Sequence, residues 1–297
     1  MRHNNPGSRF CWGSQQWRIF SVVLLISASA HLAAHELPTA ASGCVRYLGN
    51  EGLVISAGDS KILFDAFFTN SYGQYTLVPE AQQRALLAGE PPYDAIDALF
   101  VSHVHGDHFS AQPTMAYLLA QPQVELYASQ QVVDVLLEQG GEQAQSLKPR
   151  LHGFRLQVGD EPKIVTAEDL QIDMVRIPHA GGEARADIEN LAFRVALDDQ
   201  LTVMHMGDAD PEEDLFAPYQ DHWDARALDM AFPPYWFMNH YEGIIILEQR
   251  LKAGQVVGIH VPEKAVDDPP AWKQKYQGDL FIVPGEVRVA GDASCAD

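Results

Sequence analysis

The feature that most constrains this chain is a dense group of metal-ligand side chains at residues 102–108. The segment reads Ser-His-Val-His-Gly-Asp-His and directly follows the apolar run 98–101. Imidazole and carboxylate groups are preferred ligands of Zn²⁺, and the junction between a strand and a loop can direct alternate side chains toward one point. Gly106 allows a tight turn there. The segment therefore predicts a metal site built from four side chains, which are His103, His105, Asp107 and His108.

Three more side chains of ligand type lie further along the chain. Each directly follows a strand-like apolar run: His179 after 174–178, Asp208 after 204–207, and His260 after 256–259. In open α/β sheets, the carboxyl ends of successive strands lie at one edge and form ligand sites there. We therefore expect these three side chains to lie close to the first four.

The spacing of apolar and turn residues predicts a mixed α/β chain. Short alternating stretches over 45–64 indicate a β-meander. Helical periodicity is expected at 79–88, 114–121, 130–139 and 242–253. Strand-like runs separate these helices, at 98–102, 124–128, 170–177, 191–197, 201–204 and 256–259.

The order of these motifs resembles that of the metallo-β-lactamase superfamily. The likeness rests on His-x-His-x-Asp-His at 103–108, Pro-His-Ala-Gly-Gly at 178–182, Gly-Asp at 207–208 and Gly-Ile-His at 258–260. It spans about residues 44–290. The segments 47–52 and 62–65 are similar to the opening hairpin of the ascorbate-phosphate-lactonase-like branch. The resemblance implies a four-layer αββα sandwich in one domain, residues 35–297.

The resemblance also implies a role for each ligand residue. His103, His105 and His179 would hold one divalent ion, Asp107, His108 and His260 a second, and Asp208 would bridge the two. Zinc is the expected metal, although the same donors accept Mn²⁺, Fe²⁺ or Co²⁺. Two such ions, about 3.5–4 Å apart, would lower the pKa of a bridging water so that hydroxide attacks the substrate. Asp107 would transfer a proton during turnover or act only as a ligand.

Two polar residues are candidates for supporting the ligands. Asp65 ends a strand of the opening meander, where relatives often place an acid that hydrogen-bonds a ligand histidine. The alternative is a cap on a turn. His205 lies three residues before Asp208 and would support the ligands, or else be a sheet residue with an ordinary partner.

An aromatic segment, Phe-Pro-Pro-Tyr-Trp-Phe-Met-Asn-His at 232–240, follows another strand-like run. It is a candidate wall of the substrate pocket, through Tyr235, Trp236 and His240. In the alternative interpretation, Trp236 and Phe237 pack on the following helix and His240 is a partly exposed N-terminal residue of that helix. The sequence leaves both open.

The motifs also separate classes of enzyme. True metallo-β-lactamases carry Cys or Ser where this chain has Asp208, and the di-iron oxygen-reducing relatives carry Glu where it has His105. The expected activity is hydrolysis of an ester, lactone, amide or phosphodiester bond in a small or lipid-derived substrate. A periplasmic β-lactamase and a non-catalytic metal-binding protein on the same fold are the alternatives. Because all seven ligand positions are filled, the sequence disfavours a non-catalytic metal-binding protein.

The N-terminal segment predicts export. Arg2, Arg9 and Arg18 precede the apolar run 19–34, which ends in small residues and has about 16 positions, fewer than the roughly 20 that span a bilayer. Residues 1–34 are therefore expected to be a signal peptide for the periplasm, with a retained membrane anchor as the alternative.

Charge limits the partners. The net charge of −20 becomes −23 without residues 1–34, because three arginines and no acid are lost. A surface of this charge disfavours nucleic acid. A small-molecule substrate is expected, with no stable membrane partner after cleavage of the signal, and the sequence does not indicate an oligomeric state.

The cysteines fit an oxidising compartment. Cys11 would leave with the signal peptide, and Cys44 and Cys295 remain near the ends of the mature chain. We predict a disulfide between them. The alternative is two unrelated thiols.

Overall fold

The computed structural model describes residues 41–293 and 295, which belong to one compact unit, 39–297. The expected signal peptide, 1–34, and its cleavage site lie outside the described residues. Among the described residues, no helix is both long and apolar enough to cross a membrane.

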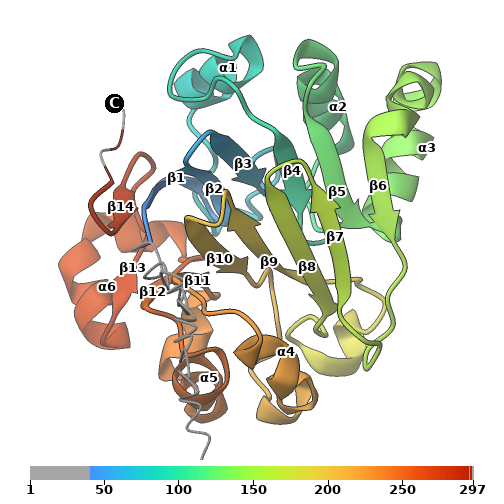
Figure 1. The fold of residues 1–297 in the computed structure, drawn as a ribbon. Coiled ribbons are helices and arrows are strands. Elements are labelled where there is room, and N and C mark those ends of the chain that lie inside the picture. Colours follow the sequence, from blue (N-terminus) through green and yellow to red (C-terminus); the bar gives the residue numbers. More distant parts are fainter. Residues whose placement is uncertain (1–40, 294, 296–297) are drawn as a thin grey trace, which may run out of the picture. The chain divides into compact units, whose positions relative to one another are not determined.

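Two seven-stranded sheets form the centre of this unit (Figure 1). In the first sheet the strand order is β14-β1-β2-β3-β4-β5-β6, and in the second it is β13-β12-β11-β10-β9-β8-β7. The strands of the first sheet are β14 (Val287–Ala290), β1 (Gly43–Gly49), β2 (Gly52–Ala57), β3 (Ser60–Phe64), β4 (Ala98–Val101), β5 (Glu125–Ser129) and β6 (Leu151–Phe154). Those of the second are β13 (Asp279–Leu280), β12 (Gln255–Gly258), β11 (Met230–Phe232), β10 (Leu201–His205), β9 (Leu191–Leu197), β8 (Leu170–Arg176) and β7 (Lys163–Ala167).

Helices cover the outer face of each sheet and complete four layers (Figure 1). On the first sheet lie α1 (Glu80–Ala88), α2 (Ala111–Ala120) and α3 (Gln130–Leu147). Along the second lie α4 (Gln220–Asp224), α5 (Tyr241–Ile245) and α6 (Pro269–Tyr276). This is the expected αββα sandwich, and the fold class predicted from the sequence is confirmed.

The largest core lies between the two sheets. It contains the fully buried rings of Phe64, Phe100 and Phe193, and the centroids of Phe64 and Phe100 are 4.8 Å apart. Burying one such side chain contributes about 1.5–3 kcal/mol. Both faces of the sheets are covered, so β4 is apolar throughout and β9 is buried throughout rather than alternating between buried and exposed positions.

The helix expected at 242–253 is shorter and less regular than predicted. Helix α5 ends at Ile245, and a π-helical turn, Ile246–Leu251, continues it. The left-handed residue that ends this segment is Lys252, with φ 52°, and not Gly254. The apolar residues Ile246, Leu247 and Leu251 are buried, so packing against the second sheet outweighs the preference for regular α-helix.

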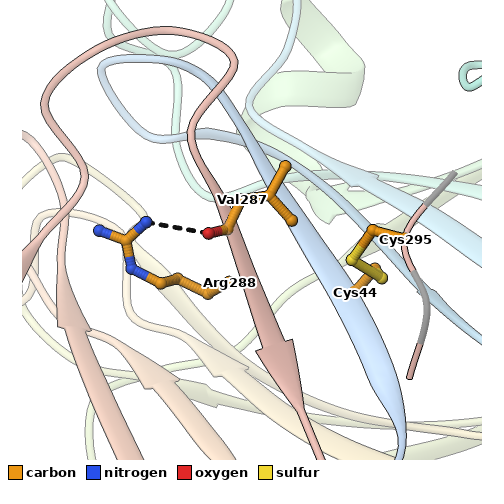
Figure 2. The surroundings of a disulfide bond; sticks show 4 residues. All are labelled: Cys44, Val287, Arg288 and Cys295. Carbon is orange, nitrogen blue, oxygen red and sulfur yellow. Dashed lines mark hydrogen bonds between the residues drawn. A yellow bond between two sulfur atoms is a disulfide. The ribbon is translucent and has the colours of Figure 1, made fainter. Parts of the chain in front are cut away.

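A disulfide joins the two ends of the described chain (Figure 2). Cys44 in β1 is bonded to Cys295, with a Cα–Cα distance of 5.7 Å and a sequence separation of 251. Strand β1 also pairs antiparallel with β14, where Cys44 lies opposite Val289. The predicted disulfide is confirmed.

Candidate metal centre

The candidate ligands meet at one edge of the sandwich because each follows the carboxyl end of a strand. Residues 102–108 follow β4, His179 follows β8, Asp208 follows β10, and His260 follows β12. An isolated bridge between His179 and Ala209 aligns two of these loops. The structure thus brings together all seven residues that the motifs singled out.

The first group of donor atoms comes from three histidines and one carboxylate. His105 Nδ1 lies 3.1 Å from His103 Nε2 and 3.0 Å from His179 Nε2. Asp208 Oδ2 is 3.1 Å from His179 Nε2. One donor atom from each of these four residues falls within 4.8 Å of the others, which is compact enough for a single cation.

The second group faces the other oxygen of the same carboxylate. His260 Nε2 is 3.4 Å from Asp107 Oδ2, and His108 Nε2 is 3.7 Å from that atom. Asp208 Oδ1 lies 3.1 Å from His260 Nε2 and 3.4 Å from His108 Nε2. Asp208 therefore directs Oδ2 at the first group and Oδ1 at the second.

Several atoms of this cluster fit bound cations and lack any other partner. His108 Nε2, His260 Nε2 and Asp208 Oδ1 are buried and make no hydrogen bond. Buried polar atoms almost always have partners, and leaving one without costs about 1–3 kcal/mol. A divalent ion in each group would satisfy them, so the residues present fit a metal centre.

The ionisation of the cluster also indicates cation binding. Burial lowers the pKa of His260, but Asp208 and Asp107 outweigh it and raise that pKa to about 10. Burial raises the pKa of Asp208, but His260 and His108 hold it well below its usual range. His260 thus favours a proton on a ring that a metal would use, and metal binding would release that proton.

Asp65 determines how His108 is oriented. Its Oδ2 lies 2.9 Å from His108 Nδ1, and its Oδ1 accepts a hydrogen bond of 2.8 Å from the Ser102 amide. A proton on Nδ1 leaves Nε2 as the nitrogen of His108 that could bind a cation. Asp65 itself adopts a left-handed backbone conformation, with φ 38°, and its carboxylate contacts His108 on the side away from Asp208.

His205 supports the site indirectly. Its Nε2 donates to the Glu51 carbonyl at 3.0 Å, its Nδ1 accepts from the Gly207 amide at 3.3 Å, and its ring stacks on Phe64 at 4.6 Å. These contacts tie the β1–β2 turn to the loop that carries Asp208. No contact joins His205 to the seven candidate ligands among the hydrogen bonds of the described residues.

Glu51 is a buried residue of the site that sequence reasoning missed. It is fully buried, and neither carboxylate oxygen has a hydrogen-bond partner. Oε2 lies 3.7 Å from His108 Nδ1 and 3.6 Å from His205 Nε2. Burial raises its pKa well above the usual range. The signal available was an acid inside an otherwise apolar hairpin, between Gly49 and Gly52.

Two asparagines hold the ligand loops, and both were also missed. Asn190 Oδ1 accepts from the Asp208 amide at 3.0 Å, and Asn50 Nδ2 donates to the Asp107 carbonyl at 2.9 Å. Gly207, with φ 55°, lies so close to Asn190 that a Cβ there would be 2.3 Å from Asn190 Oδ1. Only glycine therefore fits before Asp208.

The rim of the site is aromatic on the side of His260. The centroid of Tyr75 lies 4.2 Å from that of His260, and the centroid of Trp236 lies 5.2 Å from it. Trp236 Nε1 donates to the Ala209 carbonyl at 3.2 Å. Tyr75 was missed from the sequence because it belongs to a loop without a motif.

The three residues proposed for the substrate pocket occupy different places. Trp236 lies beside His260, whereas Tyr235 packs against Trp236, Tyr276 and Trp272. His240 is exposed and caps α5 by accepting from the Gly243 amide at 3.4 Å. Both sequence interpretations thus describe part of this segment.

Comparison with known proteins agrees with this geometry. The family model described as a β-lactamase superfamily domain matches residues 60–261. No curated protein sequence matches the chain at a significant level. Among solved structures, a metallo hydrolase from Ignicoccus hospitalis, Igni18, is 18% identical and has a TM-score of 0.54, with 84% of this chain and 98% of that chain covered.

Two other solved structures share the fold. The metallo-β-lactamase-fold protein YhfI from Bacillus subtilis is 19% identical, with a TM-score of 0.52 and coverage of 84% of this chain and 99% of that one. An isothiocyanate hydrolase from Delia radicum gut bacteria is 14% identical, with a TM-score of 0.53 and coverage of 82% and 98%.

The four-layer fold is shared with these solved structures, and the histidine and aspartate cluster lies at its strand ends. The chain belongs to the β-lactamase superfamily, in its metallo-β-lactamase-fold branch. The family predicted from the sequence motifs is therefore confirmed.

Proposed function

We propose that this protein is an exported hydrolase that binds two divalent ions. Zinc is the metal proposed for both sites. The observation that carries the proposal is the position of Asp208, whose two oxygens face two separate groups of histidines at 3.1 Å each. A carboxylate placed in this way would fix the separation of two cations. Such ions lower the pKa of bound water and polarise the oxygen of a substrate.

The residues of the chain would supply position and proton transfer. His105 is half-buried, so the first group is accessible to solvent. In the second group, His108 and His260 are both buried. Asp107 is the proposed proton-transfer residue. Burial raises its pKa, but His108 and His260 outweigh this and lower it below the usual range. Asp107 is thus an anion at neutral pH, as a metal ligand must be, and a proton role would require that it leaves the metal during turnover.

The bond cleaved is proposed to be an ester, lactone, amide or phosphodiester of a small or lipid-derived substrate. The isothiocyanate hydrolase among the similar structures extends the range of bonds worth testing. The aromatic rings of Tyr75 and Trp236 beside His260 favour a substrate with an apolar part.

Export to the periplasm is proposed from residues 1–34 and is supported by the disulfide between Cys44 and Cys295. Disulfides form and persist in oxidising compartments. Fractionation of cells that express the full chain, and of cells that express residues 35–297, tests it. Recovery of both forms in the cytoplasm would contradict export.

The function is tested with purified protein by elemental analysis and by hydrolysis of p-nitrophenyl ester, lactone, bis(p-nitrophenyl) phosphate and nitrocefin substrates. The key variant is Asp208→Asn, which keeps the shape but removes the shared anion. Asp210→Asn, two residues further along the same loop, is the matched control.

We expect two metal ions per chain in the wild type and in the control. Asp208→Asn should lose at least one ion, and its activity should fall by about 100-fold or more. Absence of bound metal after reconstitution would overturn the two-metal proposal. Zinc-dependent turnover of nitrocefin alone would instead indicate a β-lactamase.

A further inference from the structure

One cationic side chain touches the candidate ligands. Arg185 ends the short 3₁₀ helix Gly182–Arg185, is exposed, and places Nη1 2.9 Å from His105 Nε2. Among residues 41–293 and 295, this is the only hydrogen bond or ion pair of the Arg185 side chain. Its acidic neighbours in the sequence, Glu183 and Asp187, do not pair with it.

The contact with Arg185 uses the Nε2 atom of His105 and leaves Nδ1 of that ring to the first group. His105 Nδ1 faces His103 Nε2 and His179 Nε2, so a cation in the first group would take the Nδ1 lone pair. The guanidinium of Arg185 therefore lies at the other edge of the His105 ring, on the rim of the site and outside the first group.

In the structure the guanidinium pairs with no carboxylate of the described residues. A guanidinium presents a planar fork of N–H donors that matches the oxygens of a carboxylate or a phosphate. The opposite side of the site, around His260, is lined by Tyr75 and Trp236. The rim is therefore cationic beside the first group and aromatic beside the second.

We propose that Arg185 binds an oxyanion of the substrate, so that the substrate carries a carboxylate or phosphate on the His105 side of the scissile bond and an apolar group on the His260 side. This inference rests on the proposed hydrolase function and adds the substrate class to it. Arg185 is a residue for specificity and takes no part in activating water.

The overall charge of −20 does not oppose such a site. At physiological ionic strength, charges more than about 8 Å apart are largely screened. A local guanidinium beside divalent cations then dominates the potential that a bound oxyanion meets. The acidic surface elsewhere would slow the approach of anions more than it would weaken their binding.

The kinetic test compares two substrates with the same leaving group on the zinc-loaded protein. These are p-nitrophenyl acetate, which is neutral, and mono-p-nitrophenyl succinate, which carries a carboxylate. Arg185→Ala should lower kcat/KM for the succinate ester by about 10- to 100-fold, chiefly through KM, and change the acetate ester by less than about 2-fold. Arg185→Lys should lose less, because it keeps the charge but not the fork.

The matched control is Arg226→Ala. Arg226 is also an accessible arginine, but it pairs with Asp199, which precedes β10 at the end opposite His205. It should leave both substrates unchanged. Equal losses on the two esters in Arg185→Ala, or the same pattern in the control, would overturn the inference.

Calorimetry supplies a readout that does not depend on turnover. Succinate and inorganic phosphate are titrated into the zinc-loaded wild type and Arg185→Ala, with metal content measured in each. We expect at least about 10-fold weaker binding of one of the two anions to the variant, and the tighter one identifies the class. Identical binding by both proteins, or no binding by either, contradicts the role of Arg185. If the wild type holds no zinc, the proposed function itself fails, and the metal analysis shows this separately.

Discussion

Asp65 Oδ2 lies 2.9 Å from His108 Nδ1, and this contact decides which nitrogen of His108 faces Asp208. The two residues are 43 positions apart and come from different strand ends, β3 and β4. The parallel pairing of these strands, with Phe64 beside Phe100, puts them in register.

Replacing Asp65 with Asn should therefore weaken metal binding without removing a candidate ligand. The amide keeps only one acceptor oxygen, so it cannot accept from the Ser102 amide and from His108 Nδ1 through two separate oxygens, and His108 loses its fixed orientation. We expect about a 10- to 100-fold lower affinity for one of two ions, measured by competition with a chelator. Asp97→Asn is the control, since Asp97 caps the opposite end of β4. An unchanged affinity in Asp65→Asn would show that His108 is oriented by other contacts.

Glu51→Gln should raise the stability of the metal-free protein and reduce the additional stability that bound metal confers. An unpaired buried carboxylate is costly, so its neutral isostere should stabilise the metal-free protein by about 1–3 kcal/mol, a rise of several degrees in Tm. Bound cations would favour the ionised form of Glu51 beside His108, so a neutral amide in its place should also weaken cation binding, by about 10-fold. Thermal unfolding with and without zinc measures both.

The control for this pair of effects is the exposed Glu248→Gln. It should leave both Tm values unchanged. A drop in the Tm of metal-free Glu51→Gln would mean that Glu51 has a partner that stabilises it in the absence of metal.

His222 should make the fold sensitive to acid. Burial and the adjacent Arg194 lower its pKa to about 4, below the roughly 6.5 of an unfolded chain. The stability that neutral His222 contributes is therefore present above pH 6.5 and is lost as the pH falls from 6.5 through 4. Between pH 7 and 4.5, the free energy of unfolding should fall by about 1 kcal/mol less in His222→Gln than in the wild type, as measured by urea unfolding. An equal loss in both proteins would assign the acid sensitivity to other groups.

The disulfide should stabilise the fold by restricting the unfolded chain. The double variant Cys44→Ser, Cys295→Ser should lower the free energy of unfolding by about 2–4 kcal/mol, because the bond closes a loop of 251 residues. Reductant should lower the stability of the wild type to the same value and leave the variant unaffected. The bond would be ruled out if reductant left the stability of the wild type unchanged and both cysteines reacted with an alkylating agent in the absence of reductant.

The sequence indicated the fold class and the seven candidate ligands because their signals are local. The spacing in 103–108 places several donors within a few bonds of one another, and His179, Asp208 and His260 each follow an apolar run. Strand ends meet at one edge of a sheet whatever the details of packing. Such patterns can be recognised without knowing the neighbours of any residue.

The sequence by itself thus determined the family and the chemistry of the donors. Only the tertiary structure decided which nitrogen of each histidine faces the centre, that Glu51 lies unpaired beneath His108, and that Arg185 reaches His105. These are contacts between residues 57 and 80 positions apart. They depend on how the two sheets and their loops pack, and hydrogen-bond partners, burial and charge are properties of that packing rather than of any one segment.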